Sequence, residues 1–245
     1  MVKNMIYMKK TIIIIILIFL SVSVSALDLS VGSGGLAGYT FTRYTLEGGS
    51  VKSIQNMDRM NYAGFMFFNA AYGTLSVMYQ GGNNTFRENM VLEGSELADK
   101  TGSGAESSLG FALLGKYPFD INERVSVFPM FGVEYHIALV QRRTTEGGVV
   151  YDRSGGHFME DRDKDNNAYP LSAWNSLWVN IGGGLDYSIT GPIFLRTELL
   201  FGFRLPTAYE MGALKVVEHQ IGVKDPKLGG LTGSPALKIG VGYRL

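Results

Sequence analysis

Three carboxylates in one segment have the spacing that begins a calcium-binding loop. Asp161, Asp163 and Asp165 stand at alternate positions, as the first ligands of such a loop do. A calcium loop also needs glycine at its sixth position and glutamate at its twelfth, where this chain has Asn166 and Ser172. A solvated acidic loop is the favoured interpretation, calcium is a weak alternative, and we expect no cofactor.

Other catalytic groups are sparse. The chain has no cysteine, which excludes a thiol nucleophile, a disulfide framework and a cysteine-ligated metal. Its three histidines are His136, His157 and His219. Ser154 lies near His157, but the glycine-rich stretch between them offers no strand to hold a nucleophile and base in register. We therefore expect a protein that is not an enzyme.

The overall charge argues against a nucleic-acid partner. Lys plus Arg and Asp plus Glu number 22 each, so the chain lacks the basic excess that a phosphate backbone attracts.

The first residues form a targeting segment. Lys3, Lys9 and Lys10 precede an apolar run over 12–20, and Val24-Ser25-Ala26 has the pattern of a cleavage site. The run is shorter than the ~17–25 residues that span a bilayer, which makes a retained anchor the weaker alternative. We predict a signal peptide over 1–26 and one domain over 27–245.

The remaining chain alternates with a period of two, which is the period of β-strands. Along 124–140 every odd position lacks charge, whereas the even positions mix small, polar and charged groups, and 193–205 repeats this pattern. Eight such segments are predicted, at 27–43, 59–71, 74–81, 107–117, 124–140, 174–187, 193–205 and 236–245. We expect each of them to be a strand with one apolar and one mixed face.

The connections between these segments are alternately long and short. Long polar stretches at 44–58, 82–106, 141–173 and 206–235 alternate with short links at 72–73, 118–123 and 188–192. In an antiparallel meander, all long connections then lie at one end, and both termini lie at the other with the short turns. The predicted fold is all-β, an eight-stranded antiparallel up-and-down β-barrel.

Alternation alone does not decide which face is inside. A soluble lipocalin-like barrel turns its apolar face inward, whereas a transmembrane barrel turns it toward lipid. The export signal, the long loops at one end only, the small residues of the mixed face and the tyrosines near strand ends favour the membrane. These tyrosines are Tyr72, Tyr117, Tyr187 and Tyr243. We predict that Leu199 faces lipid and that its neighbour Leu200 faces the lumen.

The chain end resembles a known family. Residues 236–245 read ALKIGVGYRL, with Tyr243 third from the end and apolar residues at alternate positions before it. This run resembles the C-terminal insertion signal of bacterial outer-membrane barrels, although the last residue is Leu245 where those signals usually have Phe or Trp. The mature chain is similar to the small OmpX/OmpW/OmpA-type barrels, which implies short periplasmic turns and four long extracellular loops.

The mixed face supplies two sets of candidate site residues. A predicted polar network in the lumen comprises Lys116, Glu134, Arg196, Glu198, Arg204 and Lys238. A predicted apolar pocket comprises Phe65, Phe67, Phe128, Trp174, Trp178 and Phe194. The polar network is a candidate for gating, with charge pairing in a narrow lumen as the favoured alternative. The apolar pocket is a candidate for binding hydrophobic solutes, with simple filling of the lumen as the favoured alternative.

The expected role is structural and surface-exposed, in the bacterial outer membrane, with loops that could be adhesive or face a host. The alternative is a narrow channel for small hydrophobic solutes, which the resemblance to OmpW-like barrels implies. The expected partners are outer-membrane lipid, the barrel-assembly machinery and a possible ligand of the extracellular loops.

Overall fold

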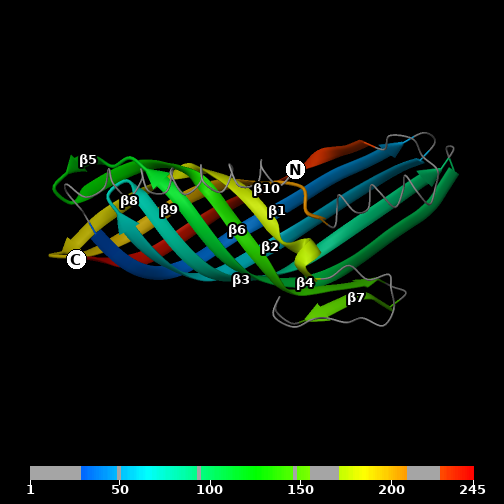
Figure 1. Cartoon of the computed structure of the whole chain (residues 1–245), viewed down its shortest axis with the longest axis horizontal. Helices are drawn as coiled ribbons and strands as arrows, with labels where there is room; N and C mark the ends of the chain where they lie inside the picture. Colours follow the sequence, from blue (N-terminus) through cyan, green and yellow to red (C-terminus); the bar gives the residue numbers. More distant parts are fainter. Residues whose placement is uncertain (1–28, 49–50, 93–94, 146–147, 155–170, 209–226) are drawn as a thin grey trace, which may run out of the picture.

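The computed structural model describes residues 29–48, 51–92, 95–145, 148–154, 171–208 and 227–245. Within these residues there are ten strands and one short 3-10 helix, shown in Figure 1. The elements are β1 (Leu29–Gly48), β2 (Val51–Ala70), β3 (Gly73–Leu92), β4 (Ser95–Lys116), β5 (Phe119–Asn122), β6 (Val125–Thr145), β7 (Gly148–Ser154), η1 (Leu171–Trp174), β8 (Ser176–Thr190), β9 (Ile193–Arg204) and β10 (Lys227–Arg244). The predicted signal peptide lies outside the described residues.

Eight of the ten strands close into a ring, which confirms the predicted antiparallel barrel. Each ring strand pairs with its neighbour in the order β4-β3-β2-β1-β10-β9-β8-β6, and β4 pairs with β6 to complete the circle. Because β1 pairs with β10, the first and last strands leave no open edge. The short strands β5 and β7 lie outside the ring and pair with β6.

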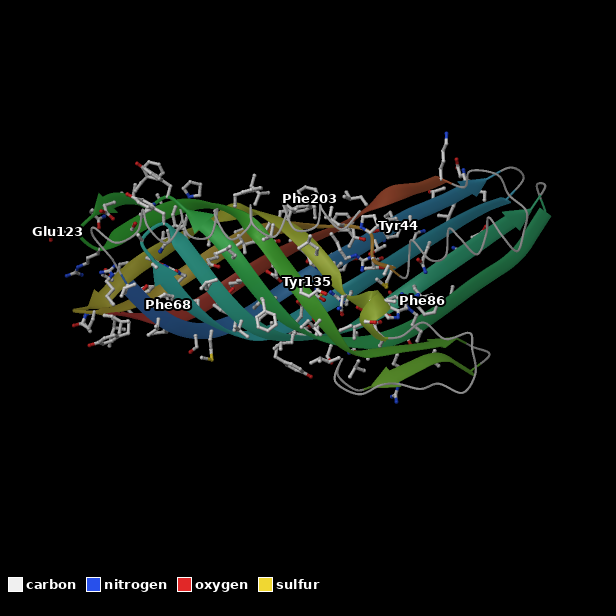
Figure 2. The ribbon with its side chains drawn as sticks, viewed as in Figure 1. Tyr44, Phe68, Phe86, Glu123, Tyr135 and Phe203 are labelled. Carbon is white, nitrogen blue, oxygen red and sulfur yellow. The ribbon has the colours of Figure 1, made fainter. Side chains whose placement is uncertain are left out.

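The faces of the wall follow the predicted parity. Leu199 is 64% exposed on the outside, whereas Leu200 is 4% exposed inside. Phe68 and Phe203, labelled in Figure 2, belong to the same exposed apolar exterior. A closed barrel with an apolar outside has the arrangement that lipid requires, because the backbone groups of the wall pair with neighbouring strands all around the ring. The part of the chain that the structure describes contains no helix with the length and hydropathy of a transmembrane helix.

Stacked aromatic rings mark the end with the short turns. The rings of Tyr72 and Tyr117 lie 5.6 Å apart at an angle of 12°, and Phe119 packs on Tyr117 at 4.9 Å. The chain end reaches this rim too, where the Leu245 amide donates to the Leu29 carbonyl at 2.9 Å. Amphipathic rings at this level suit the boundary between lipid and water.

The prediction of loops at 44–58 and 82–106 is wrong, because most of these residues belong to paired strands. β1 and β2 pair without interruption out to Gly48 and Val51, and β3 and β4 pair out to Leu92 and Ser95. Figure 1 shows these strands continuing past the ends of β8 and β9, so that the barrel wall is longer on one side than on the other. Both faces of the extensions carry polar residues, so the alternation that marks a strand in lipid disappears although backbone pairing continues.

The other two predicted loops are also partly strand. Residues 227–235 belong to β10, and β6 extends to Thr145 and pairs with β7. The ends of the ring strands that these connections join still lie opposite the short turns, as predicted.

The exposed wall should respond to charge according to depth. We expect Leu199→Arg, at mid-strand, to lower the free energy of unfolding in bilayers by about 2–4 kcal/mol, whereas a cation near the edge of the membrane costs about 0–1 kcal/mol. The matched variant is Leu205→Arg, which lies just past the end of β9 and is 47% exposed. Denaturant titration in lipid vesicles measures both. Equal costs at the two positions would contradict a lipid-facing wall.

Candidate functional site

The candidate site is the interior of the barrel, where inward side chains form layers along the axis. Near the short turns the central group is Arg196, whose side chain is 1% exposed. Its Nε donates to Asp186 Oδ1 at 2.7 Å and its Nη2 to Asp186 Oδ2 at 2.5 Å, a bidentate pair. Its Nη1 donates to Asn69 Oδ1 at 2.7 Å and lies 3.9 Å from Glu198 Oε1. A guanidinium held on all sides in this way fixes three strands against one another.

Aromatic rings surround the same guanidinium. The Arg196 Cζ atom lies 4.7 Å from the ring centre of Phe67, 5.1 Å from that of Phe128 and 5.3 Å from that of Phe194. These rings belong to a buried cluster together with Phe65, Met78, Ala112, Leu114, Met130 and Leu200. Ring faces attract a cation, most strongly where water is excluded. The cluster and the ion pair together fill this half of the lumen.

A second polar layer centres on Glu134. One of its carboxylate oxygens contacts the His136 Nε2 atom, and the other accepts from Asn180 Nδ2 at 3.1 Å and lies 3.9 Å from Lys238 Nζ. The Ser108 hydroxyl lies 2.9 Å from His136 Nδ1. Each buried charge in this layer has an opposite charge or a hydrogen-bond partner, as burial requires.

The order Ser108, His136, Glu134 matches that of a nucleophile, a base and an orienting acid. An ionised Glu134 accepts only, so in the neutral imidazole Nε2 carries the proton and Nδ1 can accept from the Ser108 hydroxyl. The cavity beside Ser108 measures ≈30 Å³, room for about two water molecules. The three side chains form a hydrogen-bonded link between β4 and β6.

The third layer lies toward the other end of the barrel. Glu106 pairs with Arg59 and accepts from Asn84 Nδ2 at 2.7 Å. Above it, the Arg143 guanidinium stacks 4.6 Å from the ring centre of Trp174 and 5.5 Å from that of Phe86. Trp174 belongs to η1 and is 9% exposed. The short helix thus places a large ring across the interior.

Little space is left between the layers. A second cavity, lined by Glu134, His136, Lys238 and Trp178 among others, measures ≈40 Å³. Each of the two cavities holds only a few water molecules, since one needs about 10–15 Å³. Eight strands leave a lumen that side chains can fill, and the layers around Arg196, Glu134 and Glu106 occupy much of it here.

The structure divides the six predicted network residues among separate layers. Arg196 approaches Glu198, and Lys238 approaches Glu134. Lys116 lies 5.2 Å from the ring centre of Phe128, near the short turns. Arg204 lines the ≈30 Å³ cavity with Glu106. Two pairs of the predicted set are therefore close to each other, whereas Lys116 and Arg204 lie at other levels of the lumen.

The six predicted pocket residues also separate. Phe65, Phe67, Phe128 and Phe194 share one packed cluster, whereas Trp178 lies beside His136 with ring centres 6.1 Å apart and Trp174 lies at Arg143. Asp161, Asp163, Asp165, His157 and His219 fall outside the described residues. Within the described ranges, no group of three or more His, Asp or Glu side chains could hold a metal ion.

Sequence reasoning missed several partners that complete these layers. Asp186 lies at an even position of its strand, among the residues of the mixed face. That position could have predicted that its side chain points inward, as that of Arg196 does. Arg59 was placed at the edge of a segment, and Glu106 and Asn84 were placed in a predicted loop. Their inward direction therefore could not be inferred until the strand extensions were known.

A charged cluster on the outside marks the upper limit of the apolar wall. Arg43 and Asp58 form an ion pair at 2.8 Å beyond Met60 and Tyr62 on the exposed face. The hydrogen bond from Arg43 holds the pKa of the Asp58 carboxyl below its usual value, although partial burial opposes this shift. The resulting stabilisation is present above the ordinary pKa and is lost as the pH falls through the lowered value. Exposure to solvent keeps it small.

The Arg196–Asp186 pair provides a test of the filled lumen. We expect Arg196→Met to lower the free energy of unfolding by about 3–5 kcal/mol, because it leaves a buried carboxylate unpaired. Adding Asp186→Asn to that variant removes the unpaired charge and should recover much of the loss. Unfolding titrations of both single variants and the double variant measure the coupling. Strictly additive costs would show that the two side chains do not depend on each other.

Comparison with known proteins gives likeness of shape only. No protein-family model matches the chain, and neither does a curated protein. Among solved structures, the chain is similar to Neisserial surface protein A at 13% identity, covering 87% of this chain and 99% of that one with a TM-score of 0.36. It is also similar to Ail of Yersinia pestis at 12% identity, covering 89% of this chain and 99% of that one with a TM-score of 0.33. A third similar structure is OprG of Pseudomonas aeruginosa, at 11% identity, covering 90% of this chain and 96% of that one with a TM-score of 0.43. The fold assignment rests on the strand pairing of the chain itself.

Proposed function

We propose that this chain is an integral outer-membrane β-barrel with a structural, surface-exposed role and without catalysis. The observation that carries the proposal is the combination of an apolar exterior with a packed, internally paired lumen. Large apolar side chains cover the outside of a closed ring, and lipid is the solvent that matches such a surface. The export signal and the outer-membrane-type chain end predicted from the sequence agree with this location.

The lumen favours a scaffold over a channel. Arg196 with its aromatic rings and the Glu134 layer lie across the interior, and the cavities beside them measure ≈30 and ≈40 Å³. A steady path for ions or solutes would need these pairs to break, which leaves charges buried without partners. The strand extensions beyond the membrane are then the part of the protein available to other molecules, as binding surfaces on rigid scaffolds commonly are.

A narrow path for small hydrophobic solutes is the second candidate. One observation favours it: a hollow of ≈590 Å³ on the lipid side of the wall, lined by Gly182, Gly183 and Gly184 and reaching Phe128 of the inner cluster. Three consecutive glycines thin the wall at this point. An apolar solute moving sideways between lumen and lipid would pass here.

Location and orientation can be tested with single cysteines, because the chain has none of its own. We expect Glu47→Cys, on the strand extension, to react with a membrane-impermeant maleimide on intact cells, since extensions and long connections lie outside. Asp120→Cys, at the short turns, should react only after the outer membrane is opened. The unmodified chain is the labelling control.

Two other labelling patterns would contradict this arrangement. Reaction of Asp120→Cys alone on intact cells would reverse the orientation. Reaction of neither position until the cells are opened would contradict surface exposure altogether.

Scaffold and channel differ in conductance and in fluorescence. We expect the refolded protein to give no steady ion conductance in planar bilayers and no saturable quenching of tryptophan by aromatic ligands, because side chains fill the lumen. Trp178→Phe keeps an aromatic ring beside His136 and isolates the signal of Trp174. Discrete conductance steps, or saturable quenching that disappears in Trp178→Phe, would favour the hydrophobic path instead.

A further inference from the structure

A second hollow lies on the outside of the wall, where the strands leave the apolar band. It measures ≈560 Å³ and crosses four neighbouring strands, β2, β3, β4 and β6. Its lining residues are Asn56, Asp58, Thr85, Phe86, Arg87, Thr101, Gly102, Ser103 and Thr144. Phe86 and Gly102 form its floor, and the other seven point outward by the alternation of the strands. Most of the outward side chains around the hollow are small and polar, so they do not fill it.

The strand register arranges these side chains in two rows. One row runs Asp58, Thr85, Ser103, Thr144 across the four strands, each residue paired with the next. The neighbouring row runs Arg43, Asn56, Arg87, Thr101. Paired side chains on one face of a sheet lie about 4.5–5.5 Å apart. Hydroxyl and amide groups are therefore presented at close, regular intervals beside arginines.

A third arginine lies just outside the lining of the hollow, on its membrane side. Arg142 falls in the register row of Tyr39, Met60 and Ala105, one row closer to the membrane. Asp58 is the single carboxylate among the described lining residues, and it pairs with Arg43. Arg87 and Arg142 also have contacts within the chain, so a bound anion would join groups that are already held in place.

The height of the hollow identifies what it faces. Met60 and Tyr62 follow Asp58 on the outer face of β2, with exposures of 50% and 59%, and they belong to the apolar band. The hollow therefore begins where that band ends. At this level a membrane protein is surrounded by lipid head groups, whose anionic groups attract basic side chains.

We propose that this hollow binds the phosphorylated sugar head group of a glycolipid in the outer leaflet, an inference that rests on the proposed outer-membrane location. Guanidinium groups of Arg87 and Arg142 match the geometry of phosphate oxygens. The hydroxyls of Thr85, Thr101 and Ser103 suit a ligand rich in hydroxyl groups. A simple phospholipid would leave most of these hydroxyls unused. A protein partner would find no exposed large apolar side chain among the lining residues, although such a side chain anchors most protein interfaces.

The test uses the full-length mature chain refolded in detergent micelles and examined by native mass spectrometry. The added probes are lipid A, lipid A without its phosphates, phosphatidylglycerol and inorganic phosphate. We expect lipid A to be retained most strongly. The Arg87→Gln and Arg142→Gln variants should each weaken its apparent affinity about fivefold, the contribution of one basic residue near an anionic surface. Ser103→Phe, which fills the hollow without changing charge, should weaken it too.

The matched control is Arg124→Gln, an exposed arginine at the opposite end of the barrel, which should leave retention unchanged. A gel-mobility difference between heated and unheated samples verifies that each variant is folded. Equal retention of lipid A and phosphatidylglycerol, full competition by inorganic phosphate, or unchanged retention in the hollow variants would each overturn the inference. Failure of the wild-type chain to fold in micelles would instead contradict the proposed function.

Discussion

The structure depends on closing the sheet. In lipid an unpaired backbone amide or carbonyl has no water to bind, so a membrane-spanning sheet cannot keep an open edge. Here the pairing of β1 with β10 removes the edges that the chain ends would leave, and it runs from Ser30 opposite Arg244 to Glu47 opposite Lys227. The Leu245 amide adds a last bond to Leu29. The pairing of the first and last strands therefore completes the ring.

Closure with eight strands determines what the lumen can contain. A ring of this size has an interior only about as wide as its side chains, so charged residues that point inward are buried and must find partners. Arg196 meets this requirement with Asp186, Asn69 and aromatic rings, and Glu134 meets it with His136, Lys238 and Asn180. The layered pairs follow from the narrow ring.

Beyond the membrane the same strands meet a different solvent. The backbone pairing that lipid imposes below continues upward as far as Gly48 with Val51 and Leu92 with Ser95. Outward positions there no longer need to be apolar, and they carry hydroxyl, amide and guanidinium groups instead. The wall thus changes from a surface for acyl chains to a surface for polar molecules without any change of fold.

The eight ring strands, their antiparallel order and their two faces could be predicted from the amino-acid pattern, because the period of two persists wherever one face meets lipid. That pattern assigned Leu199 outward and Leu200 inward from parity alone, and the exposed fractions agree. It also placed Arg196, Glu198, Glu134 and Lys238 on the mixed face.

The partners of these charges and the full length of the strands could not be predicted, because both depend on how the strands pair in the closed ring. Partners in the lumen come from strands distant in sequence, such as Asn69 with Arg196, and their contact depends on the register and closure of the ring. The extensions were hidden because solvated strands lose the hydrophobic alternation while their backbone pairing persists. For the same reason the sequence pattern placed Glu106 in a loop and Arg59 at the edge of a strand. Both lie in paired strands, and their side chains point into the lumen.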